Sequence, residues 1–530
     1  MTSYCSLLYL MIFLPGVILV YSIAPRRLRP AVLLLASYAF FAEISGKLAI
    51  YLLGATAVSY LAGLRLSALT DERDRRLRAA EKEEKKSLRL ECRRKKRQVL
   101  AVGVLALLGI LVALKYSAFL GENGNVLLRA LHLPEILPVP SFVLPIGISF
   151  YTLQAVSYLA DVHRETIPAD KNPVRLALYL SFFPQIMEGP ICRYAETSAM
   201  LWQGERITFR NLTFGIQRII FGLLKKMVIA DRLNILIRTV FDGYEQYDGG
   251  IIAVAMFFYT CQLYMEFSGT MDVVAGSGEI FGVKLPENFR QPFLARSIRK
   301  FWTRWHITLG TWFKDYVFYP LSVSKGLNRL TVRARKRFGN QYGPILTAGV
   351  ALLAVWLCNG LWHGAGWNYI FFGMYHFAWI MFENLTEPPV RACAKKWNID
   401  RESVPWKAMQ VARTVVLVNI GELFFRAETL SAGFAMFGRM TTGFSLSSFW
   451  DGTILTLGMD SLDFLIAGIA ILLVLGLNLQ REKGVKLREW LAGQRTALRW
   501  AVLLALILFV VIFGAYGQGY IPVDPIYANF

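Results

Sequence analysis

The sequence predicts an all-α protein whose chain crosses a membrane many times. Three observations support this: the composition, the apolar runs and the distribution of charge. The chain has 530 residues, of which 55% are hydrophobic and only 18% are charged. A soluble globular domain carries about 45–50% apolar and about 25% charged residues. Because soluble chains of this length divide into domains with polar surfaces, the apolar excess excludes an ordinary soluble protein, and it also excludes a disordered one.

Apolar runs long enough to cross a bilayer, which takes about 17–25 residues, occur along the whole chain. No strand-like alternation and no repeat period is visible, so each run predicts a helix. The expected spans are residues 4–22, 29–45, 47–68, 99–121, 141–161, 174–190, 211–240, 250–268, 345–362, 367–384, 408–425, 461–479 and 497–516. Two further apolar segments, 270–283 and 302–322, are broken by Gly or charged residues, and we expect them to be re-entrant or buried within the bundle.

Lys and Arg gather in short segments between the apolar runs, which orients the chain because basic residues stay on the cytoplasmic side. Arg26, Arg27 and Arg29 follow the first run, and a densely charged loop at 69–98 lies two predicted spans further on. We expect that loop to form a solvated helical hairpin or a lipid-facing surface. Residues 516–530 contain no Lys or Arg. The pattern predicts a multi-pass protein of the plasma membrane, surrounded by lipids, with both termini extracytoplasmic.

Several other classes of protein are disfavoured. The net charge of +21 does not predict nucleic-acid binding, since the positive-inside bias accounts for it and no nucleic-acid-binding motif is present. The six Cys are scattered without ligand spacing, so neither a disulfide framework nor a metal site is expected. The chain also lacks a glycine-rich phosphate loop, an H-E-x-x-H zinc helix and a G-x-S-x-G elbow, so no bound cofactor is expected.

Two of the five His are candidate functional residues, because ionisable groups at membrane depth are costly and rare. His306 lies in the stretch FWTRWHIT, and His363 lies in NGLWHGAG at the end of the apolar run 345–362. For a single His, an interfacial residue satisfied by a backbone carbonyl is the simpler interpretation. Two His, each among Trp residues and each near a broken or ending membrane segment, indicate a reaction centre instead.

Seven short motifs occur in order within residues 141–430. They are Leu144–Phe150, Phe183–Pro190 with Arg193 and Tyr194, Glu266–Gly269 with Asp272, Pro286–Phe289 with Gln291 and Pro292, Phe301–His306, Leu361–Gly364 and Phe424–Glu428. In these motifs and their order the chain resembles the membrane-bound O-acyltransferases, in the bacterial branch that contains alginate O-acetylases and teichoic-acid D-alanyltransferases. The family commonly has Asp where Glu266 stands and an aromatic residue where Thr270 stands, so the acyl or acceptor preference can differ here.

The resemblance implies a ring of helices around a central tunnel, in which donor and acceptor meet from opposite sides of the membrane. The essential histidine of the family falls on His363, and a second important histidine falls on His306. The implied reaction is transfer of an acyl group, with acetyl expected, from acetyl-CoA or an acyl-carrier thioester to hydroxyls of an extracytoplasmic polysaccharide or cell-wall polymer. An extracytoplasmic partner of the SGNH-hydrolase-like type is also implied.

The chemistry of that reaction suggests roles for further residues. Transfer to a hydroxyl needs a base, and a neutral imidazole in a low-dielectric site can serve as one. The developing oxyanion needs donors, which an Asn amide, an indole N–H or a guanidinium can supply. The candidates for substrate binding are Arg304, Trp305, Asp315, Asn359 and Trp362. The alternatives are interfacial packing for the Trp residues and a structural charge cluster for Arg304, Lys314 and Asp315.

The chain ends in Ile526–Phe530, with the sequence IYANF. Related bacterial acyltransferases, or their partners, end in a similar pattern in which a Tyr three residues before a terminal Phe is proposed to carry the acyl group. Tyr527 is therefore a candidate catalytic residue, although Pro525 stands where an aromatic is usual. A disordered terminus is the alternative. A phenol, with a pKa near 10, is a better leaving group than a sugar hydroxyl.

We expect one membrane domain over residues 1–530, with N-terminal spans at 1–140, the catalytic core at 141–430 and C-terminal spans with an external tail at 431–530. D-alanyl transfer to teichoic acid is an alternative within the enzyme interpretation. A transporter of lipid-linked glycans is the rival from another class, although transporters often show internal repeats that this sequence lacks. An inactive assembly scaffold is the third alternative.

Overall fold

The computed structural model describes residues 3–516, and within that range every regular element is a helix, which confirms the all-α prediction. Helices long and apolar enough to cross a bilayer make the chain an integral membrane protein. In the described part of the chain these are Arg29–Ala79, Glu84–Ala130, Gly249–Ile280, Lys325–His363, Val404–Arg426, Ser461–Glu482 and Thr496–Phe513.

Several other predicted spans form shorter or interrupted helices. The run at 141–161 becomes α5 (Ile148–His163), and the run at 174–190 becomes α6 (Pro173–Ser181). Helix α6 begins at Asn172, whose side chain accepts hydrogen bonds from the amides of Val174 and Arg175. The run at 211–240 is divided between α8 (Phe209–Leu223) and α9 (Asp231–Asp242) by a π-helical turn at Leu224–Ala230. Such turns are rare and often mark functional sites.

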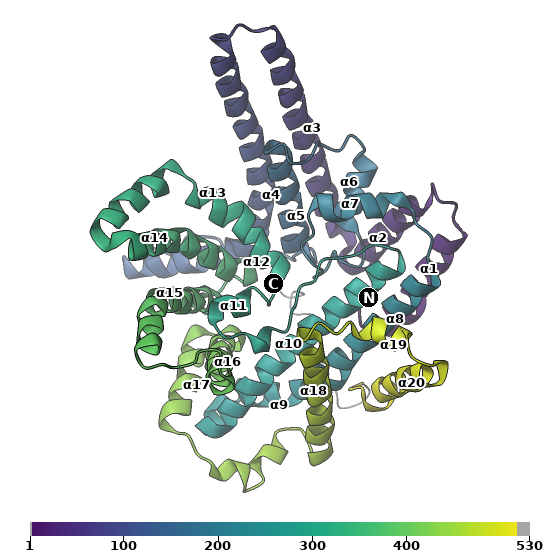
Figure 1. The fold of residues 1–530 in the computed structure, drawn as a ribbon, viewed down its shortest axis with the longest axis vertical. Coiled ribbons are helices and arrows are strands. Elements are labelled where there is room, and N and C mark those ends of the chain that lie inside the picture. The colour runs from purple at the N-terminus through teal and green to yellow at the C-terminus, as the bar shows by residue number, and fades with distance from the viewer. Residues whose placement is uncertain (1–2, 517–530) are drawn as a thin grey trace. The chain divides into compact units, whose positions relative to one another are not determined.

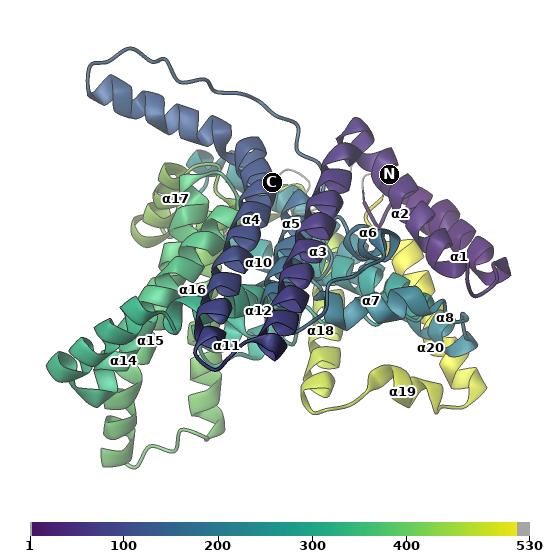
Figure 2. The same ribbon diagram turned by 90° about the horizontal axis from the view of Figure 1, so that it is seen from above.

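The chain forms two compact units, and the first contains residues 3–215 and 274–286. Its helices, besides α5, α6 and the beginning of α8, are α1 (Leu14–Ile23), α2 (Arg29–Ser45), α3 (Ala49–Ala79), α4 (Glu84–Ala130) and α7 (Tyr194–Gln203). Helices α3 and α4 run side by side and pack against α5, as the two views in Figure 1 and Figure 2 show.

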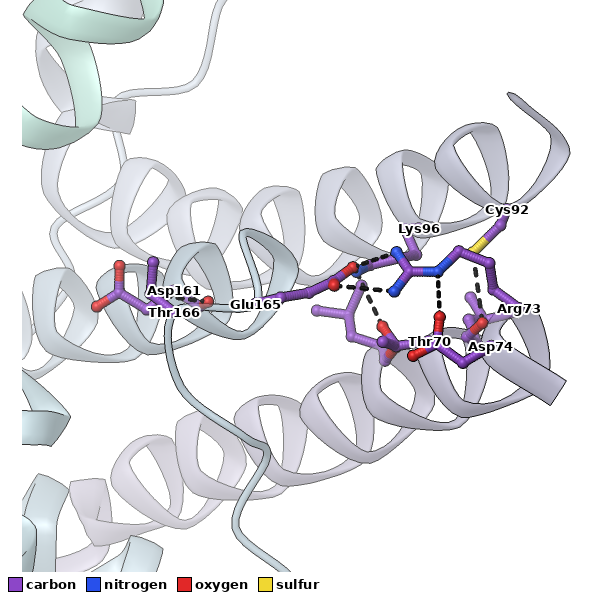
Figure 3. A network of polar contacts seen from close by, with 10 residues as sticks. Thr70, Arg73, Asp74, Cys92, Lys96, Asp161, Glu165 and Thr166 are labelled. Atoms are coloured by element: carbon purple, nitrogen blue, oxygen red, sulfur yellow. Dashed lines mark hydrogen bonds and ion pairs between the residues drawn. The ribbon is translucent and has the colours of Figure 1, made fainter. Parts of the chain in front are cut away.

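The charged segment at 69–98 forms the adjoining ends of α3 and α4, as a helical hairpin. Glu165, which follows α5, accepts hydrogen bonds from Arg73 at 2.6 and 3.0 Å and from Lys96 at 2.6 Å (Figure 3). Lys96 also donates to the Thr70 hydroxyl at 2.9 Å. The hydrogen bonds from Arg73 lower the pKa of Glu165 to about 2. One carboxylate therefore joins both helices of the hairpin to the end of α5.

The second unit contains residues 216–273 and the described residues from 287 onward. Besides the end of α8 and α9, its helices are α10 (Gly249–Ile280, which continues into the first unit), α11 (Ile298–Trp302), α12 (Ile307–Phe313), α13 (Tyr319–Ser322), α14 (Lys325–His363), α15 (Trp367–Lys396), α16 (Val404–Arg426), α17 (Leu430–Thr442), α18 (Ser461–Glu482), α19 (Leu487–Ala492) and α20 (Thr496–Phe513).

Segment 270–283 forms the end of α10, which continues without interruption to Ile280, and its side chains are mostly buried. Of the two alternatives expected for this segment, burial within the bundle is therefore the one observed. A glycine of this segment serves as a contact point between helices, because a Cβ atom on Gly215 of α8 would lie 2.6 Å from the carbonyl oxygen of Gly276 in α10. Small residues allow such close backbone approach in membrane helices. Segment 302–322 is interrupted after α11 by a turn at residues 303–306, and α12, the π-helical turn Lys314–Phe318 and α13 then follow one another without a gap.

Close packing of α14 against α15 fixes the position of His363. A Cβ atom on Gly373 would lie 2.4 Å from the carbonyl oxygen of Trp356, and one on Gly360 would lie 2.5 Å from that of Tyr369. The last turn of α14 is therefore held directly against the first turns of α15. His363 ends α14, because the next residue, Gly364, adopts an extended backbone.

Candidate active site

His306 lies in a tight turn between α11 and α12, where it is 2% exposed. Its backbone is left-handed, with φ 45° and ψ 51°, which is uncommon for a residue other than glycine. Such conformations persist only where the surroundings determine them, and they cluster at functional sites. Burial lowers the pKa of His306 to about 3, so its imidazole is neutral at physiological pH.

Asn288, for which the sequence predicts no role, holds this turn in place. Its side-chain oxygen accepts hydrogen bonds from the Thr308 amide at 3.1 Å and the Thr308 hydroxyl at 2.9 Å. The same oxygen lies 3.3 Å from Nδ1 of His306. Because this oxygen accepts from a backbone N–H, it can only accept from the imidazole as well. The proton of neutral His306 is therefore assigned to Nδ1, which leaves the lone pair on Nε2.

His363 is 5% exposed and is surrounded by aromatic rings from α15 and α16. Its ring centroid lies 5.9 Å from that of Phe372 and 5.2 Å from that of Phe425. The following residue must be a glycine for lack of space, since a Cβ atom on Gly364 would lie 2.2 Å from the ring of Tyr369. The Trp-His-Gly motif thus places an imidazole at the end of a helix, inside an aromatic enclosure.

Trp362 lies between the two histidines, both of which pack against its indole. The ring centroids of His306 and Trp362 are 5.5 Å apart, and those of Trp362 and His363 are 5.1 Å apart. Phe267 of α10 covers His306 on another side, with centroids 4.9 Å apart. The structure therefore brings together the two histidines and one of the tryptophans that the sequence selected.

Asn359 lies one helical turn before His363, and residues four apart share a helix face. It is 7% exposed, and within residues 3–516 its side-chain oxygen has no hydrogen-bond partner. A buried amide oxygen usually has a partner, so this oxygen is suited to accepting a hydrogen bond from a ligand, whereas an oxyanion would be bound by the amide nitrogen. Among the predicted oxyanion donors, Asn359 lies one helical turn from His363, and Trp362 packs against both histidines.

Arg304 and Trp305 directly precede His306, and their contacts hold its turn in place. Arg304 donates to the Gln291 carbonyl oxygen at 3.2 Å and to Glu482 of α18 at 2.8 Å. Trp305 packs among aromatic residues, and its ring centroid lies 5.1 Å from Phe289 and 5.4 Å from Phe301. This geometry favours the structural alternative for both residues.

Asp315 is half-buried in the π-helical turn Lys314–Phe318 that follows α12. Tyr527 lies outside the described residues. Across residues 3–516 no group of three or more His, Cys, Asp or Glu side chains is arranged to hold a metal ion.

Comparison with known proteins identifies relatives of this chain. Residues 133–334 match the family model for the membrane-bound O-acyltransferases. The chain is 30% identical to a probable alginate O-acetylase of Pseudomonas syringae pv. tomato over 437 residues, which are 82% of this chain and 74% of the relative. It is 30% identical to the peptidoglycan O-acetyltransferase of Helicobacter pylori over 64% of this chain and 63% of the relative. A teichoic acid D-alanyltransferase of Bacillus subtilis is 29% identical over 48% of this chain and 60% of the relative.

Proposed function

The chain belongs to the membrane-bound O-acyltransferase family, and from this premise we propose that it moves an acetyl group from a cytoplasmic thioester toward hydroxyls of an extracytoplasmic polysaccharide or cell-wall polymer. The observation that carries this proposal is the pair of buried histidines packed against Trp362. Acetyl is favoured over D-alanyl because the relatives named for acetylation match 82% and 64% of the chain, whereas the D-alanyltransferase matches 48%.

In the proposed reaction, an acceptor hydroxyl attacks the thioester carbonyl, the new C–O bond forms and the C–S bond breaks. His363 takes the hydroxyl proton during attack and returns it to the departing thiolate, so no net proton is consumed. His306 can accept a hydrogen bond at Nε2 but cannot donate one there, which suits it to positioning the acceptor through a group other than the reacting hydroxyl and not to binding the oxyanion. The Asn359 amide and the Trp362 indole N–H are the proposed oxyanion donors.

The family resemblance supports the remaining parts of the proposal. Donor and acceptor meet in a tunnel between the two sides of the plasma membrane, and both termini lie outside the cytoplasm. The donor is acetyl-CoA or an acyl-carrier thioester, and no cofactor is bound. Tyr527 receives the acyl group and passes it to an extracytoplasmic partner of the SGNH-hydrolase-like type, which completes transfer to the polymer. Asp315 remains a proposed substrate-binding residue.

A direct test uses the purified protein in lipid nanodiscs with radiolabelled acetyl-CoA and an acetyl-carrier thioester as separate donors. We expect release of free thiol from one donor when a hydroxyl acceptor is added, and we expect this release to disappear in His363→Ala. A transporter would move glycan across vesicles without thioester cleavage. A scaffold would do neither, so thiol release separates the three functions.

A further inference from the structure

A cluster of basic side chains lies in the second unit, and the proposed reaction does not use it. Arg218, Phe221 and Lys225 share one face of α8 and the π-helical turn that follows, because they are three and four residues apart. The Lys225 ammonium lies 3.2 Å from the Ser268 hydroxyl and forms an ion pair with Asp272 at 2.5 Å. Arg218 donates to the other oxygen of Asp272 at 2.9 Å.

Arg481, near the end of α18, completes this basic cluster. Its guanidinium carbon lies 5.0 Å from the centroid of the Phe221 ring, and the Lys225 ammonium lies 4.8 Å from the same centroid. Two cations thus share one aromatic ring, whose electron-rich faces attract them. Within the described residues, the Arg481 guanidinium makes no hydrogen bond and no ion pair. Its donors are therefore available to a ligand.

The basic cluster carries more positive than negative charge. Arg218, Lys225 and Arg481 surround one buried carboxylate, that of Asp272. Glu287 also pairs with Arg218, at 2.6 Å, but its side chain is 61% exposed, so solvent screens much of its charge. Leaving a charge without a counter-charge in a poorly solvated site is costly. The basic cluster therefore favours an added anion.

The basic cluster is joined to the turn that carries His306 at two points. Arg218 binds Glu287, which immediately precedes Asn288, and Asn288 orients His306. Arg304, two residues before His306, binds Glu482, which is adjacent to Arg481. Basic residues continue after α18 at Lys483, Lys486 and Arg488, which predicts that this end of α18 faces the cytoplasm. That is the side from which a thioester donor arrives.

We infer that Arg481 and Arg218 bind a phosphate group of the acyl donor, with the buried Lys225 adding positive charge behind them, so that the pantetheine arm extends from there toward His306. Guanidinium groups bind phosphate through paired hydrogen bonds, which an unpaired Arg481 can supply. Both CoA and a carrier-bound phosphopantetheine have a phosphate at this end of the arm. The inference rests on the proposed function, because only a thioester donor needs such an arm.

The test measures binding, and not turnover, for the full-length protein in nanodiscs of phosphatidylcholine. The probes are CoA and pantetheine, which share the thiol arm and differ in the phosphates and the adenosine, together with 4′-phosphopantetheine, which differs from pantetheine by one phosphate alone. Wild-type protein is expected to bind CoA at least tenfold more tightly than pantetheine. Arg481→Gln should weaken CoA binding about tenfold, which corresponds to about 1.4 kcal/mol, without changing pantetheine binding. Arg481→Lys keeps a charge and should fall between the two.

Arg495→Gln is the matched control, because it removes one exposed basic residue that lies between α19 and α20. It should leave CoA affinity unchanged. A second arm repeats the titration in nanodiscs that contain phosphatidylglycerol. If that lipid competes with CoA and Arg481→Gln abolishes the competition, the basic cluster is a lipid site and the inference is wrong.

Equal affinities of wild-type protein for CoA and pantetheine would also overturn the inference, as would unchanged CoA affinity in Arg481→Gln. The proposed function fails separately. A protein that binds CoA through Arg481 but releases no thiol with any acceptor retains the phosphate site and loses the transferase assignment. A protein that transfers acetyl with normal CoA affinity in Arg481→Gln retains the transferase assignment and loses the phosphate site.

Discussion

The imidazole of His306 meets the indole of Trp362 edge-on, with ring centroids 5.5 Å apart and an interplanar angle of 72°. His306 belongs to a turn that Asn288 holds, whereas Trp362 belongs to the last turn of α14. The contact therefore joins two elements that are far apart in the sequence. Because His363 follows Trp362 directly, this contact couples the position of the His306 turn to that of His363.

The first prediction is that His363→Ala abolishes acyl transfer. The base would be lost, and a positioned base typically contributes about 10²–10⁴-fold to the rate. The measurement is thiol release from the donor, with acetyl content of the polymer in cells as a second readout. Expression and membrane insertion should be unchanged, since the ring makes aromatic contacts that other nearby rings also make. An active alanine variant would show that another group takes the proton.

The second prediction concerns His306, which positions the acceptor in the proposed reaction. His306→Ala should lower the transfer rate by about 10²–10⁴-fold, the range for a positioned catalytic group. Phe267→Leu is a useful comparison, because it changes the packing against the same imidazole without removing a nitrogen. Wild-type rates in His306→Ala would assign the residue a structural role.

The third prediction tests the tautomer that Asn288 imposes on His306. Asn288→Asp keeps an acceptor for Thr308 and for Nδ1, but its negative charge favours the protonated imidazole and so raises the pKa of His306 from its present low value of about 3. Because the reaction needs neutral His306, the acid limb of the pH–rate profile should move to higher pH. Asn288→Ala should lower the rate without this displacement. A profile that does not move in Asn288→Asp would show that His306 does not act through Nε2.

The fourth prediction concerns the tail, which lies outside the described residues. Tyr527→Phe removes only the phenolic oxygen, so it should stop transfer to the polymer while thioester binding continues. Acetylated tail peptide, detected by mass spectrometry in the wild-type protein, would support the carrier role. Normal acetylation by Tyr527→Phe would favour direct transfer from the donor to the polymer.

Sequence patterns predicted the helical class, the charged hairpin and the proximity of His306 and His363. The helical class and the hairpin follow from hydropathy and charge, which are properties of short stretches of sequence. The two histidines follow from the order of the motifs. The sequence left open whether 270–283 is re-entrant or buried, because a glycine has the same effect on a local pattern whether it bends a helix or contacts another helix. Gly276 contacts α8 at Gly215, and only the packed structure shows this.

The role of Asn288 could not be predicted, because it depends on a turn that brings residue 288 to residue 306. The available signal was its place in the Pro286–Phe289 motif. An amide in a motif that has no assigned role is a candidate for positioning a residue that has one. The anchoring role of Arg304 depends equally on a distant partner, Glu482. Pairings of this kind are set by tertiary packing, and spacing along the chain does not encode them.

The last prediction concerns Glu165, which joins α3 and α4 to the end of α5. Glu165→Gln leaves the nearly buried Lys96 without its carboxylate, so the hairpin should open more often, at a cost of about 1 kcal/mol because solvent screens the exposed part of the pair. Hydrogen–deuterium exchange at residues 70–98 is the measurement, and faster exchange is expected. Glu91→Gln is the control, because it breaks an ion pair with Lys95 within one helix and should not loosen the hairpin.

The pH dependence of the contact between Glu165 and the hairpin follows from the direction in which the pKa of Glu165 is shifted. The pKa of Glu165 is lowered from 4.5 to about 2 by its hydrogen bonds with Arg73. A carboxyl whose pKa is lower in the folded protein contributes its full stabilisation above the unfolded value and loses it as the pH falls through the folded value. The protection of the wild-type hairpin against exchange, corrected at each pH for the intrinsic rate of free amides, should therefore be constant down to about pH 4.5. It should then decrease toward about pH 2, until it matches the protection in Glu165→Gln. Equal exchange in the two proteins at neutral pH would show that Glu165 does not hold the hairpin.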